Sequence, residues 1–172
     1  MKKVKNYKLI ISGLFSAITV LCAWLTIPTA VPFTMQTLAV FLTAQLLPVQ
    51  YSLLSVAVYI GLGVVGLPVF SNFQGGIGVL AGPTGGYIIG FVFIILTTGL
   101  AQKFFGNKLI VRFFSMTIGL LLCYSFGTLW FMFVSKTDFL SAVIFCVLPY
   151  IIFDIAKMIL SVILYKRLEK LI

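Results

Sequence analysis

The stretch LIISGLFSAITVLCAWLTI, residues 9–27, decides the fold class of this chain. It contains no charged residue and follows a basic tip with four lysines. A helix rises about 1.5 Å per residue, so this run can cross a hydrocarbon layer about 30 Å thick. Because further apolar runs follow, we predict a membrane-spanning helix here and not a cleaved signal peptide.

The composition of the whole chain agrees with a membrane protein. Of the 172 residues, 62% are hydrophobic and 9% are charged, whereas soluble domains carry about 25% charged residues. Most of the surface must therefore face lipid. The absence of histidine removes Ser-His-Asp catalysis and His-bearing zinc sites. With only three acids as well, we predict no catalytic residue, no cofactor and no metal, and hence no enzyme.

The positive charges predict how the chain lies in the membrane. The net charge is +9, but ten of the twelve Lys and Arg residues flank apolar runs, at the two termini and in residues 102–112. This placement argues against nucleic acid as a partner. Basic residues favour cytoplasmic loops. We therefore expect both termini and the 102–112 connection in the cytoplasm, and residues 28–32, 66–86 and 135–138 on the outer face.

The apolar runs and their prolines predict an all-α membrane protein with six transmembrane helices. The run 139–165 is too long for one span, so Pro149 should divide it into a short interfacial helix, residues 139–148, and a sixth helix. We expect a single integral membrane domain over residues 1–172. Its predicted spans are residues 9–27, 33–47, 51–65, 87–101, 109–134 and 150–167.

Between the third and fourth spans lies GLPVFSNFQGGIGVLAGPTGG, residues 66–86. Its glycines and two prolines make it a poor continuous helix, although most of it is apolar. Irregular backbone is not tolerated against lipid, so this glycine-rich outer loop must line a cavity, pack on protein or lie at the surface. It is the first indication of a binding site.

Two ionisable residues, Asp154 and Lys157, stand inside the last span. A charge at the middle of a spanning helix costs about 2.5–3.5 kcal/mol, which makes it a candidate functional residue. Residues three apart share a helix face, so the pair could also be a purely structural ion pair. A carboxylate beside an ammonium suits a small ligand with a neutral hydrogen-bonding head and an acidic tail.

Two glycine motifs carry less information. Gly61, Gly63 and Gly66 form GxGxxG, but no acid follows at the distance that a dinucleotide fold requires. Gly13 and Ala17 give the first span a small-xxx-small face. Such a face lets another membrane helix approach closely, either from a partner or from the same chain.

The segments IPTAVPFTMQTLAV (27–40), GLGVVGLPVF (61–70) and GPTGGYIIGF (82–91), followed by Asp154 and Lys157, resemble the BioY family. This family comprises the biotin-specific substrate-binding component of energy-coupling-factor transporters. The resemblance implies six helices in a prokaryotic cell membrane and biotin bound from the outside. It also implies a complex with a membrane-embedded coupling subunit and two ATPase subunits.

The resemblance also assigns roles to residues. Asp154 would bind the ureido head of biotin, and Lys157 would bind the valerate carboxylate or support Asp154. Asn72 would complete the ureido contacts, and Gly13 and Ala17 would dock the coupling subunit. The remaining ligand-binding candidates, for cavity walls or close backbone approach, are Thr34, Gln36, Tyr87, Gly85 and Gly86.

Three other functions stay open from the sequence. The chain could capture another vitamin or a biotin precursor. It could be a membrane enzyme such as a lipid-modifying transferase, although Asp154 alone could act as an embedded acid or base there. It could also be a membrane scaffold in which Asp154 and Lys157 form an internal staple.

Overall fold

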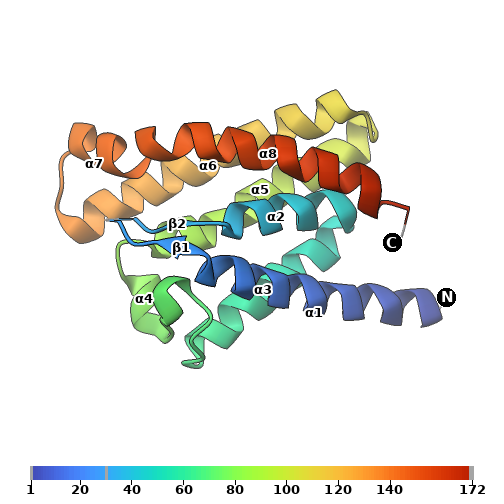
Figure 1. The fold of residues 1–172 in the computed structure, drawn as a ribbon, viewed down its shortest axis with the longest axis horizontal. Coiled ribbons are helices and arrows are strands. Elements are labelled where there is room, and N and C mark those ends of the chain that lie inside the picture. Colours follow the sequence, from blue (N-terminus) through green and yellow to red (C-terminus); the bar gives the residue numbers. More distant parts are fainter. Residues whose placement is uncertain (1, 30, 171–172) are drawn as a thin grey trace.

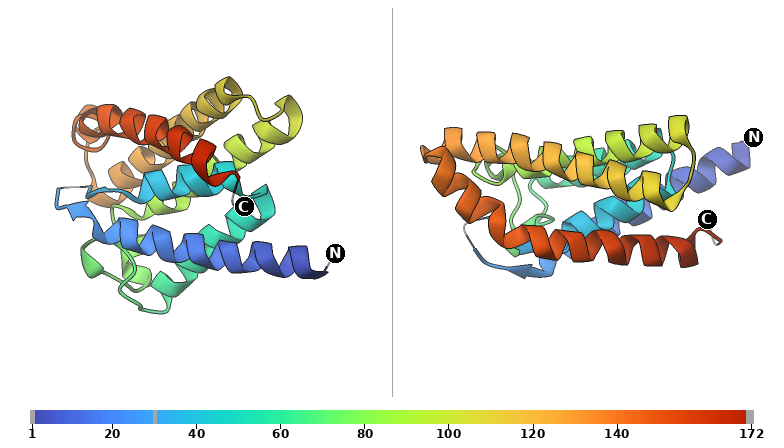
Figure 2. Two further views of the ribbon diagram at one scale, coloured as in Figure 1. Left: turned by 45° about the vertical axis from the view of Figure 1, so that its right-hand side comes forward. Right: turned by 90° about the horizontal axis from the view of Figure 1, so that it is seen from above.

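The computed structural model describes the backbone of residues 2–29 and 31–170 and the side chains from Asn6 onward. This part of the chain is mostly helical, with long helices lying lengthwise beside one another (Figure 1). The start of α1 and the end of α8 lie at the same end of the molecule, and α7 lies at the opposite end (Figure 2). The elements are α1 (Lys2–Trp24), β1 (Thr26–Ile27), β2 (Phe33–Thr34), α2 (Gln36–Leu46), α3 (Val49–Val64), the 3-10 helix η1 (Ser71–Phe73), α4 (Ile77–Ala81), α5 (Gly85–Phe105), α6 (Leu109–Ser135), α7 (Phe139–Cys146) and α8 (Leu148–Leu168).

The first span ends earlier than predicted, and the second starts later. Instead of continuing the helices, Thr26–Ile27 and Phe33–Thr34 pair as two antiparallel strands, with Thr26 opposite Thr34. Proline disfavours helical geometry in the residue before it, which is consistent with the extended conformation of Ile27 ahead of Pro28. The Met35 amide then donates to the Cys22 carbonyl at 3.1 Å, so the returning chain satisfies a carbonyl at the end of α1.

The last apolar run is divided into two helices, as predicted, but the break lies before Pro149 and not at it. The short helix α7 ends at Cys146, and α8 begins at Leu148 with Pro149 in its first turn. Proline lacks an amide hydrogen, which the first turn of a helix does not use, so it is tolerated there. The helices therefore separate at Val147, and the spanning helix starts two residues before the predicted Tyr150.

Residues 66–86 contain two short helices, η1 and α4, joined by turns. Gly66, in GxGxxG, has φ +98, which glycine adopts without strain. A side chain at Gly63 would collide with the Phe70 ring, so this glycine serves packing inside the chain. Gly78 lies in α4, and Gly82 is its C-cap.

Glycines bring α5 and α6 into close contact. A Cβ atom at Gly90 would meet Cys123 of α6, and one at Gly127 would meet the Tyr87 ring of α5. Small residues at such positions let membrane helices approach closely. The same two helices, with α2 and α3, enclose the main apolar core, which includes Phe41 and Ile94.

Four helices in the described residues are long and apolar enough to cross a membrane: Asn6–Trp24 of α1, α5, α6 and α8. Two further apolar helices, α2 and α3, are shorter, with 11 and 16 residues. At 1.5 Å per residue these two are about 16 and 24 Å long, less than the hydrocarbon thickness. If α2 and α3 span the membrane, the segments at their ends must therefore cross part of its thickness.

Candidate functional site

The two intramembrane charges form an ion pair on α8. Lys157 Nζ lies 2.9 Å from Asp154 Oδ1, and the residues are 6% and 3% exposed. They sit three residues apart and share a helix face. This face points into the protein, because both side chains bond to α2 and Asp154 also bonds to α6. Burial of such a pair is tolerated only where further hydrogen bonds complete it.

The Asp154 carboxylate is held by three donors. Lys157 and the Thr37 hydroxyl, the latter at 2.8 Å, both donate to Oδ1, and the Tyr124 hydroxyl donates to Oδ2. An ionised carboxylate has about four acceptor positions. About one position, on Oδ2, is therefore left for an N–H or O–H donor from outside the described residues.

The Lys157 ammonium has all three of its hydrogens engaged. It donates to the Thr34 carbonyl at 2.7 Å, to the Thr37 hydroxyl at 3.0 Å and to Asp154. Its Nζ also lies 4.3 Å from the centroid of the Phe33 ring, which adds a cation–π contact. Lys157 thus ties strand β2 and the start of α2 to α8, and it neutralises Asp154.

A cavity of about 70 Å³, here called the site cavity, adjoins this ion pair. Asp154 and Lys157 line it together with the predicted wall residues Thr34, Gln36 and Tyr87. The polar wall faces apolar side chains such as Phe91, a mixture typical of small-ligand sites. Its present size accommodates a few water molecules.

Residues between β1 and β2 contribute to the wall of the site cavity. Val31 and Pro32 of this segment line the cavity. Tyr150, in the first turn of α8, donates to the Val31 carbonyl, and its Oη lies 2.8 Å from Thr29 Oγ1. These contacts hold Thr29 and Val31 against α8, the helix that carries the ion pair.

The predicted wall residues are held by hydrogen bonds of their own. The Thr34 hydroxyl donates to Gln36 Oε1 at 2.8 Å, and Gln36 Nε2 donates to the Tyr59 hydroxyl. Tyr87 Oη lies 2.9 Å from Thr128 Oγ1 on α6. The polar wall is therefore ordered within the protein itself.

Three predicted residues do not line the site cavity. Asn72 is exposed, and the neighbouring Ser71 lines the cavity in its place. Gly85 and Gly86 lie at the start of α5, where added side chains would collide with the Leu80 carbonyl and with Trp130. These two glycines permit close backbone approach, and nothing places them against a ligand.

The proposed docking face on α1 lies on the surface of the chain. Gly13 and Ala17 are both exposed, and a Cβ atom added to Gly13 would meet nothing within 4 Å. Packing within the described part of the same chain therefore does not explain Gly13. Docking of a partner at this face remains a prediction.

Comparison with known proteins places this arrangement in a family. The model of the BioY family matches residues 1–172. The chain belongs to the BioY family. A solved structure described as the S-component for biotin from an ECF-type ABC transporter superposes with a TM-score of 0.92 at 27% identity. That match covers 99% of this chain and 94% of the other.

Curated relatives in the BioY family align over almost the whole chain. The biotin transporter BioY of Thermotoga maritima is 40% identical over 95% of this chain and 96% of its own length. The probable biotin transporter BioY of Pyrococcus horikoshii is 38% identical over 97% of this chain and 98% of its own length. BioY2 of Lactococcus lactis is 36% identical over 93% and 88%.

Sequence reasoning missed the residues that complete the Asp154 environment. Thr37 stands in the VPFTMQT segment, residues 31–37, which resembles the BioY family, but the predicted wall residues there are its neighbours Thr34 and Gln36. Tyr124 lies in the long apolar run of α6, and Tyr150 begins the last span. Each carries a hydroxyl into a membrane segment, where a polar group needs a partner, and that was the available signal.

Proposed function

We propose that this protein is the biotin-capture subunit of an energy-coupling-factor transporter, a transport protein and not an enzyme. Its membership of the BioY family and the names of its relatives support biotin as the substrate. The observation that carries the site assignment is the buried Asp154–Lys157 pair beside the site cavity, with about one acceptor position of the carboxylate open.

In this proposal the open position of Asp154 accepts an N–H of the ureido ring. A hydrogen bond to a charged group contributes about 1.5–3 kcal/mol, and low dielectric strengthens it. Lys157 supports Asp154 and does not bind the valerate carboxylate in this conformation, because the Thr34 carbonyl, Thr37 and Asp154 occupy its three hydrogens. It gains a free donor only if Thr34 moves away.

In this proposal, biotin enters when residues 31–34 move away from α8. Pockets that hold small ligands measure about 300–1,000 Å³, and the site cavity, at about 70 Å³, is far smaller. The bonds from Tyr150 to Val31 and from Lys157 to Thr34 are those that such a movement would break. Opening therefore both enlarges the cavity and frees Lys157.

The membrane arrangement belongs to the same proposal. We place six spans, α1, α2, α3, α5, α6 and α8, in a single integral membrane domain. Both termini lie in the cytoplasm in this arrangement, because it puts ten of the twelve basic residues on the cytoplasmic side. The coupling subunit and two ATPase subunits supply the energy. The exposed small residues Gly13 and Ala17 form the face of α1 on which the coupling subunit docks.

Equilibrium binding of labelled biotin to the purified protein in detergent tests the site. We expect Asp154→Asn to weaken binding about a hundredfold, because an N–H group replaces one acceptor. Asp138→Asn, the same change at an exposed acid before α7, is the matched control and should bind like the native chain.

The alternatives give different results in the same assay. Displacement of biotin by thiamine or riboflavin, or stronger binding of desthiobiotin, would assign another vitamin or a biotin precursor. If Asp154→Asn binds biotin as well as Asp138→Asn does, the pair is only an internal staple. That reading has support of its own, because Lys157 is fully bonded within the described protein.

A further inference from the structure

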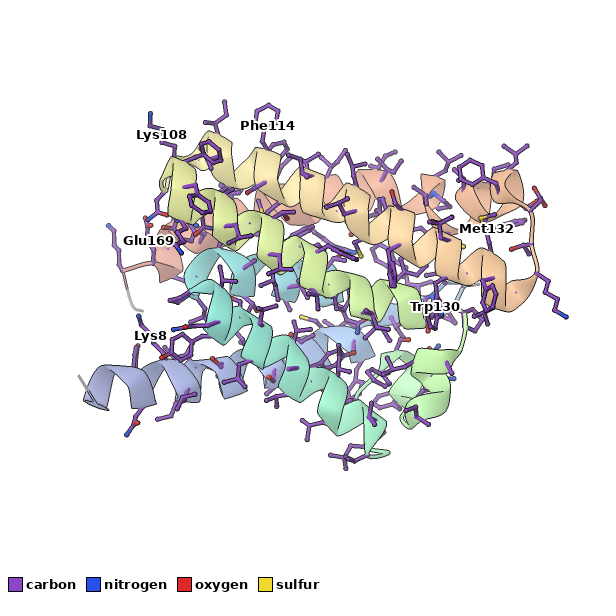
Figure 3. All side chains as sticks on the ribbon, turned by 180° about the vertical axis from the view of Figure 1, so that it is seen from behind. Lys8, Lys108, Phe114, Trp130, Met132 and Glu169 are labelled. Atoms are coloured by element: carbon purple, nitrogen blue, oxygen red, sulfur yellow. The ribbon has the colours of Figure 1, made fainter. Side chains whose placement is uncertain are left out.

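A second, larger cavity lies at the end of the molecule where the chain begins and ends. This terminal cavity measures about 840 Å³ and is bounded by α1, α2, α3, α5, α6 and α8. Lys8 of α1 and Glu169, just after α8, line it and lie together at one end, whereas Trp130 and Met132 of α6 lie at the other (Figure 3). The two cavities share no lining residue, so the terminal cavity is separate from the site cavity.

The terminal cavity is lined by more positive than negative charge. Lys8, Lys103 and Arg112 face it, and Glu169 is the one acid among the described residues of its wall. Neither lysine forms an ion pair within the described part of the chain, where Asp154–Lys157 is the only one found. Lys8 instead lies 5.9 Å from the centroid of the Tyr51 ring.

Arg112 is the unusual member of this wall. It is 1% exposed, yet its hydrogen-bond partners are all neutral. Nη1 donates to the Gln45 carbonyl at 2.9 Å, Nη2 to the Tyr165 hydroxyl at 2.8 Å, and Nε to the Asn107 carbonyl at a long 3.4 Å. A guanidinium has five N–H groups, so two are left without a partner in the described residues.

A buried charge is unfavourable unless it is compensated, and Glu169 in the same wall attracts Arg112 without forming an ion pair with it in the described residues. The stacking of Arg112 on Tyr165, 3.8 Å from guanidinium carbon to ring centroid, supplies part of the compensation. The two remaining N–H groups suit the oxygens of a phosphate, which arginine binds in bidentate fashion. An anion between Arg112, Lys8 and Lys103 would neutralise the excess positive charge of the terminal cavity.

Part of the remaining wall is apolar, as the acyl chain of a lipid requires, and the other part consists of amide side chains. Leu46, Leu53 and Leu100 line the same cavity as the three cations. A free inorganic phosphate gains nothing from contact with an apolar surface, whereas the acyl chains of a phospholipid pack favourably against it. Basic pockets between membrane helices on the cytoplasmic side are typical headgroup sites.

We infer that the terminal cavity binds the phosphate of an anionic phospholipid through Arg112, Lys8 and Lys103. The inference rests on the proposed membrane placement but not on the biotin site. A lipid bound there would join α1 to α5 and α6, which meet at this cavity.

The test uses the purified full chain in a neutral detergent and measures lipid binding by native mass spectrometry. The probes are phosphatidylglycerol, phosphatidylcholine and inorganic phosphate. We expect phosphatidylglycerol to bind in preference to phosphatidylcholine. The Lys8→Gln/Lys103→Gln double variant should weaken phosphatidylglycerol about thirtyfold, roughly fivefold for each lysine. It leaves the buried Arg112 in place, so it should still fold.

Lys136→Gln, at an exposed lysine between α6 and α7, is the matched control and should bind phosphatidylglycerol normally. Biotin affinity should be unchanged in all these variants, which separates this test from that of the biotin site. Equal binding of phosphatidylglycerol by the double variant and the control would overturn the inference. So would equal binding of both lipids, or binding of inorganic phosphate with no lipid bound.

Discussion

Asp154–Lys157 and Arg112 are both buried, yet they are compensated in opposite ways. At the site cavity a carboxylate and an ammonium neutralise each other, and hydroxyls complete the carboxylate. At the terminal cavity a guanidinium is held by two carbonyls and a phenol. A self-neutralised pair can accept a neutral hydrogen-bonding head, whereas a buried cation that forms no ion pair among the described residues favours a bound anion.

The largest expected effect comes from breaking the pair. Lys157→Met leaves Asp154 buried without its counter-charge, and we expect a loss of about 3–5 kcal/mol in the free energy of unfolding. Removing both charges in Asp154→Asn/Lys157→Met should restore most of this stability while biotin binding stays lost. Denaturant unfolding in detergent measures both variants. Additive losses in the double variant would contradict the account of a mutually neutralised pair.

A smaller effect is expected at the unpaired cation. Arg112→Met leaves three neutral acceptors without their donor, the Gln45 and Asn107 carbonyls and the Tyr165 hydroxyl, and these lie beside a cavity that water can enter. We expect a loss of about 1–3 kcal/mol in the free energy of unfolding. The same unfolding assay compares it with Lys157→Met. If Arg112→Met destabilised the protein more, the contrast between paired and unpaired charge would fail.

Two tyrosine variants sharpen the comparison further. Tyr124→Phe removes the donor to Asp154 Oδ2, so the carboxylate is less firmly held, and we expect biotin affinity to fall about tenfold. Tyr165→Phe removes an acceptor of Arg112 at the other cavity and should leave biotin affinity unchanged. Titration calorimetry measures both. Equal affinities would mean that Tyr124 does not position Asp154.

The smallest effect is expected at an exposed charge. Asp138 caps α7, and the hydrogen bond from the Ser141 amide lowers the pKa of its carboxyl below the usual value. The stabilisation is therefore present above the unfolded-state pKa, near 4, and is lost as the pH falls through the lowered folded-state value. Asp138→Ala should lower Tm by at most about 4 °C at pH 7, with less effect at acid pH. A pH-independent shift would contradict the capping role.

Local patterns predicted much of the fold because length, hydropathy and proline act locally. They placed the apolar helices to within a few residues and found the break near Pro149. They did not predict the pairing of Thr26–Ile27 with Phe33–Thr34, because two-residue strands have no periodicity to detect. The resemblance pointed to Asn72, whereas Ser71 lines the site cavity, since the path of a glycine-rich loop depends on what it packs against.

The sequence by itself determined that this is a helical membrane protein of the BioY type and that Asp154 and Lys157 share one helix face. The membrane class and the shared face follow from apolar length and helical period, which a single segment carries, whereas the BioY type follows from the resemblance of residues 27–40, 61–70 and 82–91. Only the tertiary structure decided that Thr37 and Tyr124 complete Asp154 and that Arg112 has neutral partners. Apart from the local bond from Arg112 to the Asn107 carbonyl, these contacts join residues 30 to 117 positions apart, and only the packing of the helices brings them together.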